Sequence, residues 1–293
     1  MLNIALVIFL QSLITYKDKN SIQYYKDILY LREDLAIIMD GTLTFMGTGT
    51  SQGVPMIGCD CEVCKSDDRH DKRLRASALI EYKGLTVLID AGPDFRYQML
   101  RANVRHLDAI LLTHNHKDHT GGLDDIRSFN YLENRAFPIY CEPYVQKTLK
   151  MEYSYAFTEE KYPGAPEYIL NTIGDNPFSI NGVEIIPIRA YHNKLPVLGF
   201  RFGKLAYITD ASSIPEEEFE KLGGLDILIL NTIRYSSHHS HFSVPEAVSV
   251  FEKCGAKRLY LTHLSHQLPR HEEFAAMLPK NVYPAFDGLK LSF

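Results

Sequence analysis

The sequence predicts an α/β protein in which short apolar strands alternate with helices. Its 293 residues are 45% hydrophobic, which is enough to fill a sizeable core. Strand-like runs are repeatedly followed by segments with helical patterning, the order expected of an α/β fold. Several of these runs end directly in His or Asp, so one edge of the predicted sheets is rich in metal-binding groups.

Residues 1–38 are predicted to be an N-terminal extension outside the core, and residues 39–293 to be the folded domain. The run from Leu2 to Ile14 is largely apolar, but no Lys or Arg precedes it and no small-residue cleavage site follows it. It is also too short to span a bilayer comfortably. A membrane anchor or an export signal is the alternative interpretation.

The domain itself is predicted as strands and helices in alternation. The predicted strands are 41–46, 77–82, 86–90, 108–113, 138–141, 183–190, 198–202, 205–209, 225–231 and 258–262. The predicted helices are 119–129, 144–151, 244–253 and 272–278. Residues 152–178 are rich in Tyr, Pro and acidic side chains and are predicted to form a surface loop or lid.

Charge and cysteine content narrow the class of protein. The net charge is −5 and there is no basic block, so we expect neither a nucleic acid nor a membrane as partner. Three of the five cysteines fall between positions 59 and 64. An odd, clustered set favours metal binding in a reducing compartment over a disulfide framework, so we expect a cytoplasmic protein.

Residues 113–119 read Thr-His-Asn-His-Lys-Asp-His and carry a dense group of metal-ligand side chains. They follow an apolar run and precede two glycines, so the predicted strand ends in the cluster and then turns. Imidazole nitrogen and carboxylate oxygen suit zinc, manganese and iron. The candidate ligands are His114, His116, Asp118 and His119.

Three later candidate ligands also stand at or just after the end of an apolar run. His192 comes just after the strand predicted to end at Ala190, while Asp210 and His263 each end an apolar run. This places all of them at one edge of the sheets. The seven ligands divide between two cations: His114, His116 and His192 for one, Asp118, His119 and His263 for the other, with Asp210 bridging them.

The order His-x-His-x-Asp-His, His, Asp, His resembles the metallo-β-lactamase superfamily over roughly residues 40–293. The resemblance implies a four-layer αββα sandwich of two packed sheets, with a binuclear metal site along one edge. It implies a homodimer as well.

A second group of residues narrows the resemblance to one branch of this superfamily. A glycine-rich run, residues 47–55, precedes Cys59, Cys61 and Cys64, whose thiolates can chelate one zinc if a fourth ligand closes the site. His266, three residues after His263, is the candidate. The segment resembles the PhnP-like phosphodiesterase branch, in which such residues hold a structural zinc. A redox cysteine pair and unliganded thiols are the alternatives.

This resemblance implies hydrolysis of a small cyclic or linear phosphodiester, such as 5-phosphoribosyl cyclic phosphate. Two Mn²⁺ or Zn²⁺ ions would lower the pKa of a bridging water and neutralise charge in the transition state. An RNA-processing nuclease of the same fold is the nearest alternative, but the acidic segment 152–178 argues against an RNA-gripping arm. A non-catalytic zinc-binding protein is the other, although structural zinc sites close with four ligands.

Three further roles are assigned to side chains near the ligands. Asp118 is expected to act both as ligand and as proton acceptor. His241 resembles the general-acid histidine of related phosphodiesterases, and His238 and His239 compete with it for that role. Asp90, at the end of a predicted strand, is expected to orient a metal-bound imidazole, with a turn cap as the alternative.

Overall fold

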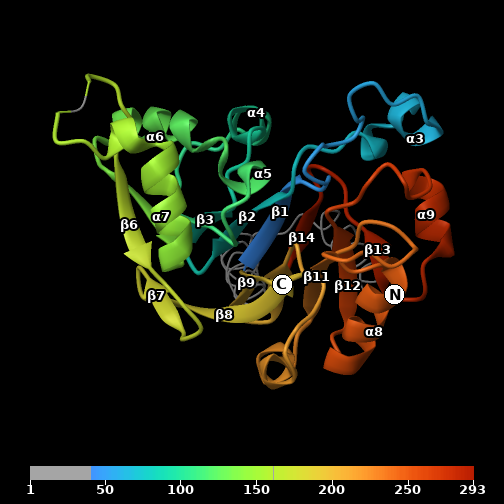
Figure 1. The fold of residues 1–293 in the computed structure, drawn as a ribbon. Helices are drawn as coiled ribbons and strands as arrows, with labels where there is room; N and C mark the ends of the chain where they lie inside the picture. The colour runs from blue at the N-terminus through green and yellow to red at the C-terminus, as the bar shows by residue number, and fades with distance from the viewer. Residues whose placement is uncertain (1–40, 161) are drawn as a thin grey trace, which may run out of the picture. The chain divides into compact units, whose positions relative to one another are not determined.

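The computed structural model describes residues 41–160 and 162–293, so the predicted extension, residues 1–38, lies outside the described residues. Within the described part, two seven-stranded mixed sheets pack face to face. Figure 1 shows α4, α6 and α7 on one side of them and α8 and α9 on the other. The predicted four-layer αββα sandwich is confirmed.

The first sheet is built from the N-terminal half of the domain and closed by the last strand of the chain. In spatial order its strands are β14 (Lys290–Ser292), β1 (Gly41–Gly47), β2 (Ser77–Tyr82), β3 (Leu85–Ile89), β4 (Ala109–Leu111), β5 (Phe137–Cys141) and β6 (Tyr168–Thr172). From β3 to β6 the neighbouring strands run parallel, so their carboxyl ends share one edge.

The second sheet repeats this plan. In spatial order its strands are β13 (Val282–Pro284), β12 (Arg258–Thr262), β11 (Ile227–Asn231), β10 (Leu205–Ile208), β9 (Leu195–Phe202), β8 (Val183–His192) and β7 (Phe178–Ile180). The strands from β10 to β13 are parallel. The backbone amide of Leu198 donates to the carbonyl of Thr113 at 3.0 Å and ties the two sheets together at the edge that carries the histidines.

Helices cover the outer face of each sheet, and short helical turns lie in the loops. The α-helices are α3 (Glu62–Lys65), α4 (Phe95–Ala102), α5 (Lys117–Thr120), α6 (Arg127–Glu133), α7 (Pro143–Glu152), α8 (Val244–Cys254) and α9 (His271–Met277). The 3-10 turns are η1 (Arg69–Asp71), η2 (Leu123–Ile126), η3 (Ser154–Ala156) and η4 (Glu216–Leu222). A capping box between Ser243 and Glu246 starts α8, and Gly255 at φ 66° ends it.

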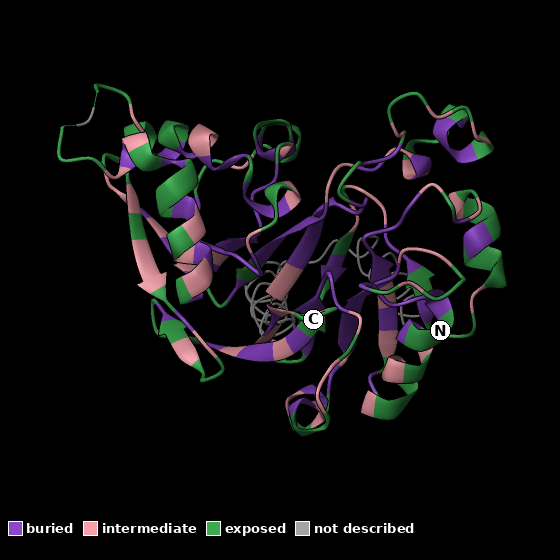
Figure 2. Ribbon diagram, in the orientation of Figure 1, coloured by how far each residue is buried: buried purple, intermediate pink, exposed green. Residues whose placement is uncertain are grey.

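Both faces of the central strands are buried, which explains their continuous apolar runs. In β1, Phe45 packs between the sheets while its neighbour Met46 packs under the helices of the first layer. In β3, Ile89 and Leu88 divide in the same way. Figure 2 shows the resulting pattern, with buried strands at the centre and exposed outer faces on α7 and α8.

Three sequence-based predictions about elements are wrong. Residues 152–178 do not form one continuous loop, because they contain η3 and the edge strand β6, whose side chains are half-buried or exposed. The helix predicted over 119–129 is divided into α5, η2 and α6, with Gly121 and Gly122 at the first break. The strand predicted to stop at Ala190 continues through His192. Within the described residues, no helix has the length and apolar character needed to cross a membrane.

Candidate metal centre

The seven predicted ligands come together at one edge of the sandwich: His114, His116, Asp118, His119, His192, Asp210 and His263. Asp210 lies at their centre. Its Oδ2 is 3.2 Å from Nε2 of His119, and its Oδ1 is 3.2 Å from Nε2 of His263. Asp118 Oδ2 is also 3.2 Å from Nε2 of His119. These four side chains place their ligand atoms within 4.8 Å of one another.

A second group shares Asp210 with the first. The ligand atoms of His192, Asp210 and His241 also lie within 4.8 Å of one another. The ring centroids of His116 and His114 are 5.1 and 5.9 Å from that of His192. The structure therefore brings His114 and His116 beside this group, and it adds His241.

The backbone at three of the strand ends adopts the left-handed conformation. Asp90, Asp210 and His263 have φ of 62°, 55° and 56°, each directly after or within two residues of a strand. Left-handed backbone costs a residue other than glycine about 1–3 kcal/mol, and it persists only where surrounding contacts enforce it. Such conformations are concentrated at functional sites. Here each one turns a polar side chain back toward the cluster.

Two glycines let the loops at this edge pack against each other. A Cβ on Gly92 would lie 1.9 Å from the carbonyl oxygen of Asp118, and one on Gly122 would lie 2.1 Å from the carbonyl oxygen of Gly92. The amide of Ala91 donates to the carbonyl of His119 at 2.8 Å across the same contact. Any larger residue at Gly92 would displace the loop that carries Asp118.

Asp90 is fully buried and contacts the cluster from behind. Its Oδ2 lies 2.6 Å from Nδ1 of His119 and accepts a hydrogen bond from the Thr113 hydroxyl at 2.9 Å. Because that hydroxyl donates to Asp90, it accepts from Nδ1 of His114, 2.9 Å away. Both rings are thereby left with Nε2 facing the cluster. This contact is the one expected of a residue that orients imidazoles.

The electrostatics of the cluster favour a cation. Burial opposes ionisation of Asp210, but the neighbouring His263 and His119 outweigh it and hold the pKa of Asp210 well below its usual value. The pKa of Asp118 is lowered in the same way by His119. Burial also opposes protonation of His119, yet Asp210, Asp118 and Asp90 raise the pKa of this histidine well above its ordinary value. Three carboxylates around one imidazole leave an excess of negative charge.

The side-chain nitrogens also fit a metal. Buried polar atoms normally have hydrogen-bond partners, and those that lack one call for an explanation. Nε2 of His114 and Nδ1 of His192 are buried without a hydrogen-bond partner. A metal ion can accept the lone pairs of such nitrogens. The donor set therefore defines a candidate metal-binding site.

The loop before α8 distinguishes the three histidines proposed as general acid. His241 is buried, with its ring 4.6 Å from that of His192 and 4.7 Å from that of His263. His238 is 5.2 Å from His241, and His239 is exposed. Only His241 among the three contacts the predicted ligands directly. Burial and the nearby His263 lower the pKa of His241 to about 2.

The predicted zinc residues form a separate group beside α3. The ligand atoms of Cys59, Cys61, Cys64 and His266 lie within 4.8 Å of one another. Nδ1 of His266 is 3.3 Å from the Cys59 sulfur and 3.5 Å from the Cys61 sulfur. Burial would raise the pKa of the Cys61 thiol, but hydrogen bonds from the Cys64 amide and from His266 outweigh it and lower the pKa to about 6. The four residues define a second candidate metal-binding site.

Sequence patterns missed the residues that hold the ligands in place. Besides Thr113, these are Thr209, whose hydroxyl donates to Asp210 Oδ2 at 2.8 Å, and Asn231, which binds the backbone of Ala211. All three are fully buried and stand at strand ends. The signal that the sequence offers for them is an isolated polar residue at or just after the end of an apolar run.

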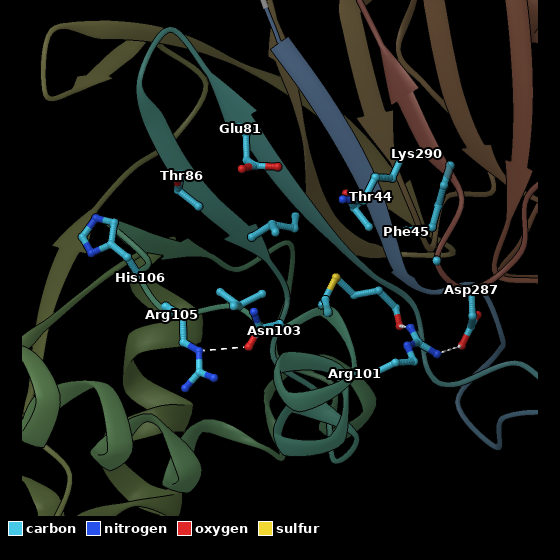
Figure 3. A pocket seen from close by; sticks show the side chains of 15 residues that line it. Thr44, Phe45, Glu81, Thr86, Arg101, Asn103, Arg105, His106, Asp287 and Lys290 are labelled. Atoms are coloured by element: carbon cyan, nitrogen blue, oxygen red, sulfur yellow. Dashed lines mark hydrogen bonds and ion pairs between the residues drawn. The ribbon is translucent and has the colours of Figure 1, made fainter.

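A hollow of about 500 Å³ lies elsewhere, between α4 and the outer face of β1 and β2. Figure 3 shows Arg101 joined to Asp287 and Arg105 joined to Asn103 at its rim. None of its lining residues belongs to either candidate metal site. Asp287 links the hollow to the glycine-rich run, since it also accepts from the hydroxyl of Thr48 at 2.8 Å.

Two facing mixed sheets with this cluster at their shared edge define the class of protein. Residues 86–264 match the family model described as a beta-lactamase superfamily domain. The chain belongs to the metallo-β-lactamase superfamily of hydrolases.

The solved structures narrow the relationship. A crystal structure described as a new diphosphatase from the PhnP family is similar at 43% identity with a TM-score of 0.81, covering 86% of this chain and 97% of that one. The resemblance to the PhnP-like branch, first suggested by the three cysteines, is confirmed.

Two curated relatives carry other names. An octanoyltransferase from Porphyromonas gingivalis is 41% identical over 248 residues, which are 84% of this chain and 50% of that protein. The chain thus spans half the length of this relative. A ribonuclease Z from Pyrobaculum calidifontis is 26% identical over 290 residues, covering 82% of this chain and 94% of that protein.

Proposed function

We propose that this chain is a metal-dependent phosphodiesterase that hydrolyses a small cyclic or linear phosphodiester, such as 5-phosphoribosyl cyclic phosphate. The position of Asp210 carries the proposal, because this carboxylate belongs to both groups of the cluster. A carboxylate with one oxygen available to each side suits a pair of cations. The likeness to a PhnP-family diphosphatase supports chemistry at phosphorus.

The seven predicted ligands would hold two Mn²⁺ or Zn²⁺ ions, and the cysteine group with His266 would hold a structural Zn²⁺. Bound at the cluster, the two ions would supply an activated water and positive charge facing the phosphate oxygens. We assign to Asp118 the uptake of the proton from the attacking water, because its carboxylate lies in the cluster, 3.2 Å from Nε2 of His119. His241 gives a proton to the leaving oxygen.

The low pKa of His241 sets a condition on that role. At neutral pH the ring is uncharged in the chain alone, whereas a general acid must carry the proton. An anionic phosphate beside the ring favours its protonated form.

The test is hydrolysis by the full chain supplied with Mn²⁺ or Zn²⁺. Bis-p-nitrophenyl phosphate and cyclic ribose phosphates represent the proposed class, precursor tRNA represents the nuclease, and an octanoyl thioester represents the chemistry named by the longer relative. We expect turnover of the small diesters. Cleavage of the RNA or the thioester alone would overturn the proposal.

Asp210→Ala separates a catalyst from a metal-binding protein without activity. We expect the rate of hydrolysis to fall at least about 100-fold in this variant. Losing a residue that only orients a metal ligand already costs 10–100-fold in metal affinity or activity. Asp226→Ala removes a half-buried carboxylate, which pairs with Lys257 and belongs to neither metal-ligand group, and is the control. A folded Asp210→Ala variant with full activity would exclude catalysis at this site.

A further inference from the structure

Asn231 ends the central strand of the parallel part of the second sheet. On one side of it, β10 leads within two residues to Asp210, and on the other β12 leads directly to His263. β11 lies between them, so its carboxyl end points into the same edge. Yet Asn231 is not part of either ligand group, although it is fully buried.

The amide side chain of Asn231 grips the backbone of Ala211 with both of its polar ends. Its Oδ1 accepts from the Ala211 amide at 2.7 Å, and its Nδ2 donates to the Ala211 carbonyl at 3.0 Å. Both bonds are buried, where hydrogen bonds are shielded from water and an unmade bond is costly. The residue that follows Asp210 is therefore held at both its backbone amide and its backbone carbonyl.

The same carbonyl connects this contact to the loop that carries His241. The amide of Phe242 donates to the Ala211 carbonyl at 2.8 Å, and the carbonyl of Phe242 accepts from the Ile233 amide at 3.2 Å. One backbone position thus stands next to the shared carboxylate and is bonded to the residue after the proposed acid. Ala211 therefore connects Asp210 with the loop that carries His241, and Asn231 holds the backbone of Ala211 in place.

We propose that Asn231 is a positioning residue, which through Ala211 keeps Asp210 in its left-handed conformation and keeps His241 against the cluster. The inference rests on the proposed function of this site. Asp210 has φ 55°, a conformation that a non-glycine residue leaves unless its neighbours prevent it. Without the two hydrogen bonds between Asn231 and Ala211, the two carboxylate oxygens of Asp210 move away from His119 and His263.

The experiment measures Co²⁺ binding by chelator competition and by visible absorption, with Asn231→Ala compared with the unchanged chain. We expect affinity at the His and Asp cluster to fall 10–100-fold, as for other residues that orient ligands, with an altered cobalt spectrum. Thiolate-to-cobalt absorption reports the cysteine site separately, and this signal stays unchanged in a folded variant.

Asn130→Ala is the matched control. Asn130 clamps Glu167 in the same manner, accepting from its amide at 3.1 Å and donating to its carbonyl at 2.9 Å, but it contacts no ligand. This variant loses stability and retains Co²⁺ affinity. An equal loss of affinity in both variants, or none in Asn231→Ala, overturns the inference.

Asn231→Asp provides a second variant should alanine prevent folding. It keeps an acceptor for the Ala211 amide and loses the amide donor, so we expect weaker Co²⁺ binding than in the unchanged chain. Unchanged affinity in a folded Asn231→Asp variant overturns the inference. A parent chain whose cluster binds no Co²⁺ contradicts the proposed function itself, which distinguishes the two failures.

Discussion

Single residues behind the cluster determine which ring nitrogen each histidine turns toward it. Asp90 and Thr113 together occupy Nδ1 of His119 and of His114, so both rings keep Nε2 for the cluster. An imidazole of the opposite tautomer would offer a proton where a metal needs a lone pair. Two buried side chains behind the ligands therefore fix which nitrogen of each ring faces the cluster.

His241 is expected to matter most when the leaving group is poor. In His241→Gln, hydrolysis of an alkyl phosphodiester should fall about 10²–10⁴-fold, the usual range for a lost general acid. Hydrolysis of bis-p-nitrophenyl phosphate should fall far less, because p-nitrophenolate leaves without a proton. Steady-state rates on the two substrates check this, with His239→Gln as the control at an exposed neighbour. Equal losses on both substrates would contradict the role.

At the residue level, the sequence was informative where a ligand is the first His or Asp after an apolar strand. That rule predicted that Asp210 and His263 lie in the cluster, where the structure places them. It could not locate Asn231 or Thr113, because their partners are backbone atoms and ring nitrogens that come close only in the folded chain. The sequence favoured His241 over His238 and His239 by resemblance alone, because the differences in burial and in contact with the predicted ligands exist only in the folded chain.

Among the elements, strands of the sandwich interior were predictable and edge elements were not. The central strands are apolar on both faces, so their runs stand out. The strands β13 and β14 have three residues each, and β6 mixes half-buried and exposed positions without regular alternation, so none gives a clear periodic signal. Helix α4 follows a Gly-Pro-Asp turn and exposes Tyr97 and Leu100, which obscures its apolar face.

The loop that carries the three cysteines is expected to be held by its own metal. Cys61→Ala should remove one tightly bound zinc per chain and lower the melting temperature, since a structural site contributes to folding. The His and Asp cluster should still bind its ions. Metal analysis and thermal unfolding check this, with Cys254→Ala as the control for a cysteine outside the group. Unchanged zinc content would refute the assignment.

The free energy of unfolding is expected to depend on pH through His271, the first residue of α9. Burial and the charge of Arg73 lower the pKa of His271 to about 4, and Arg73 lies 3.2 Å from its Nδ1. Because the folded pKa is below the ordinary 6.5, the neutral ring contributes stability above pH 6.5 that is lost as pH falls toward 4.

His271→Gln keeps an acceptor for Arg73 and removes the titration. The stability of the unchanged chain relative to this variant should therefore shrink between pH 6.5 and 4. Urea unfolding at several pH values measures the difference. A difference that does not vary with pH would show that His271 does not titrate in this window.

For the whole molecule, the fold narrows the chemistry without naming the substrate, because one superfamily fold hosts several activities. The relatives illustrate this, since they include a diphosphatase, an octanoyltransferase twice as long as the match, and a ribonuclease Z. A cytoplasmic location and a homodimer stay predictions. The architecture and the meeting of distant ligands at one edge could be predicted, because parallel strands bring their carboxyl ends together.

The count of metal ions per chain tests the central claim most directly. Elemental analysis of the purified full chain, alongside Asp210→Ala and Cys61→Ala, should give about three ions, about one and about two respectively, since a paired site needs its shared carboxylate. A single ion in the parent chain that disappears in Cys61→Ala and persists in Asp210→Ala would mean that the His and Asp cluster holds no metal pair.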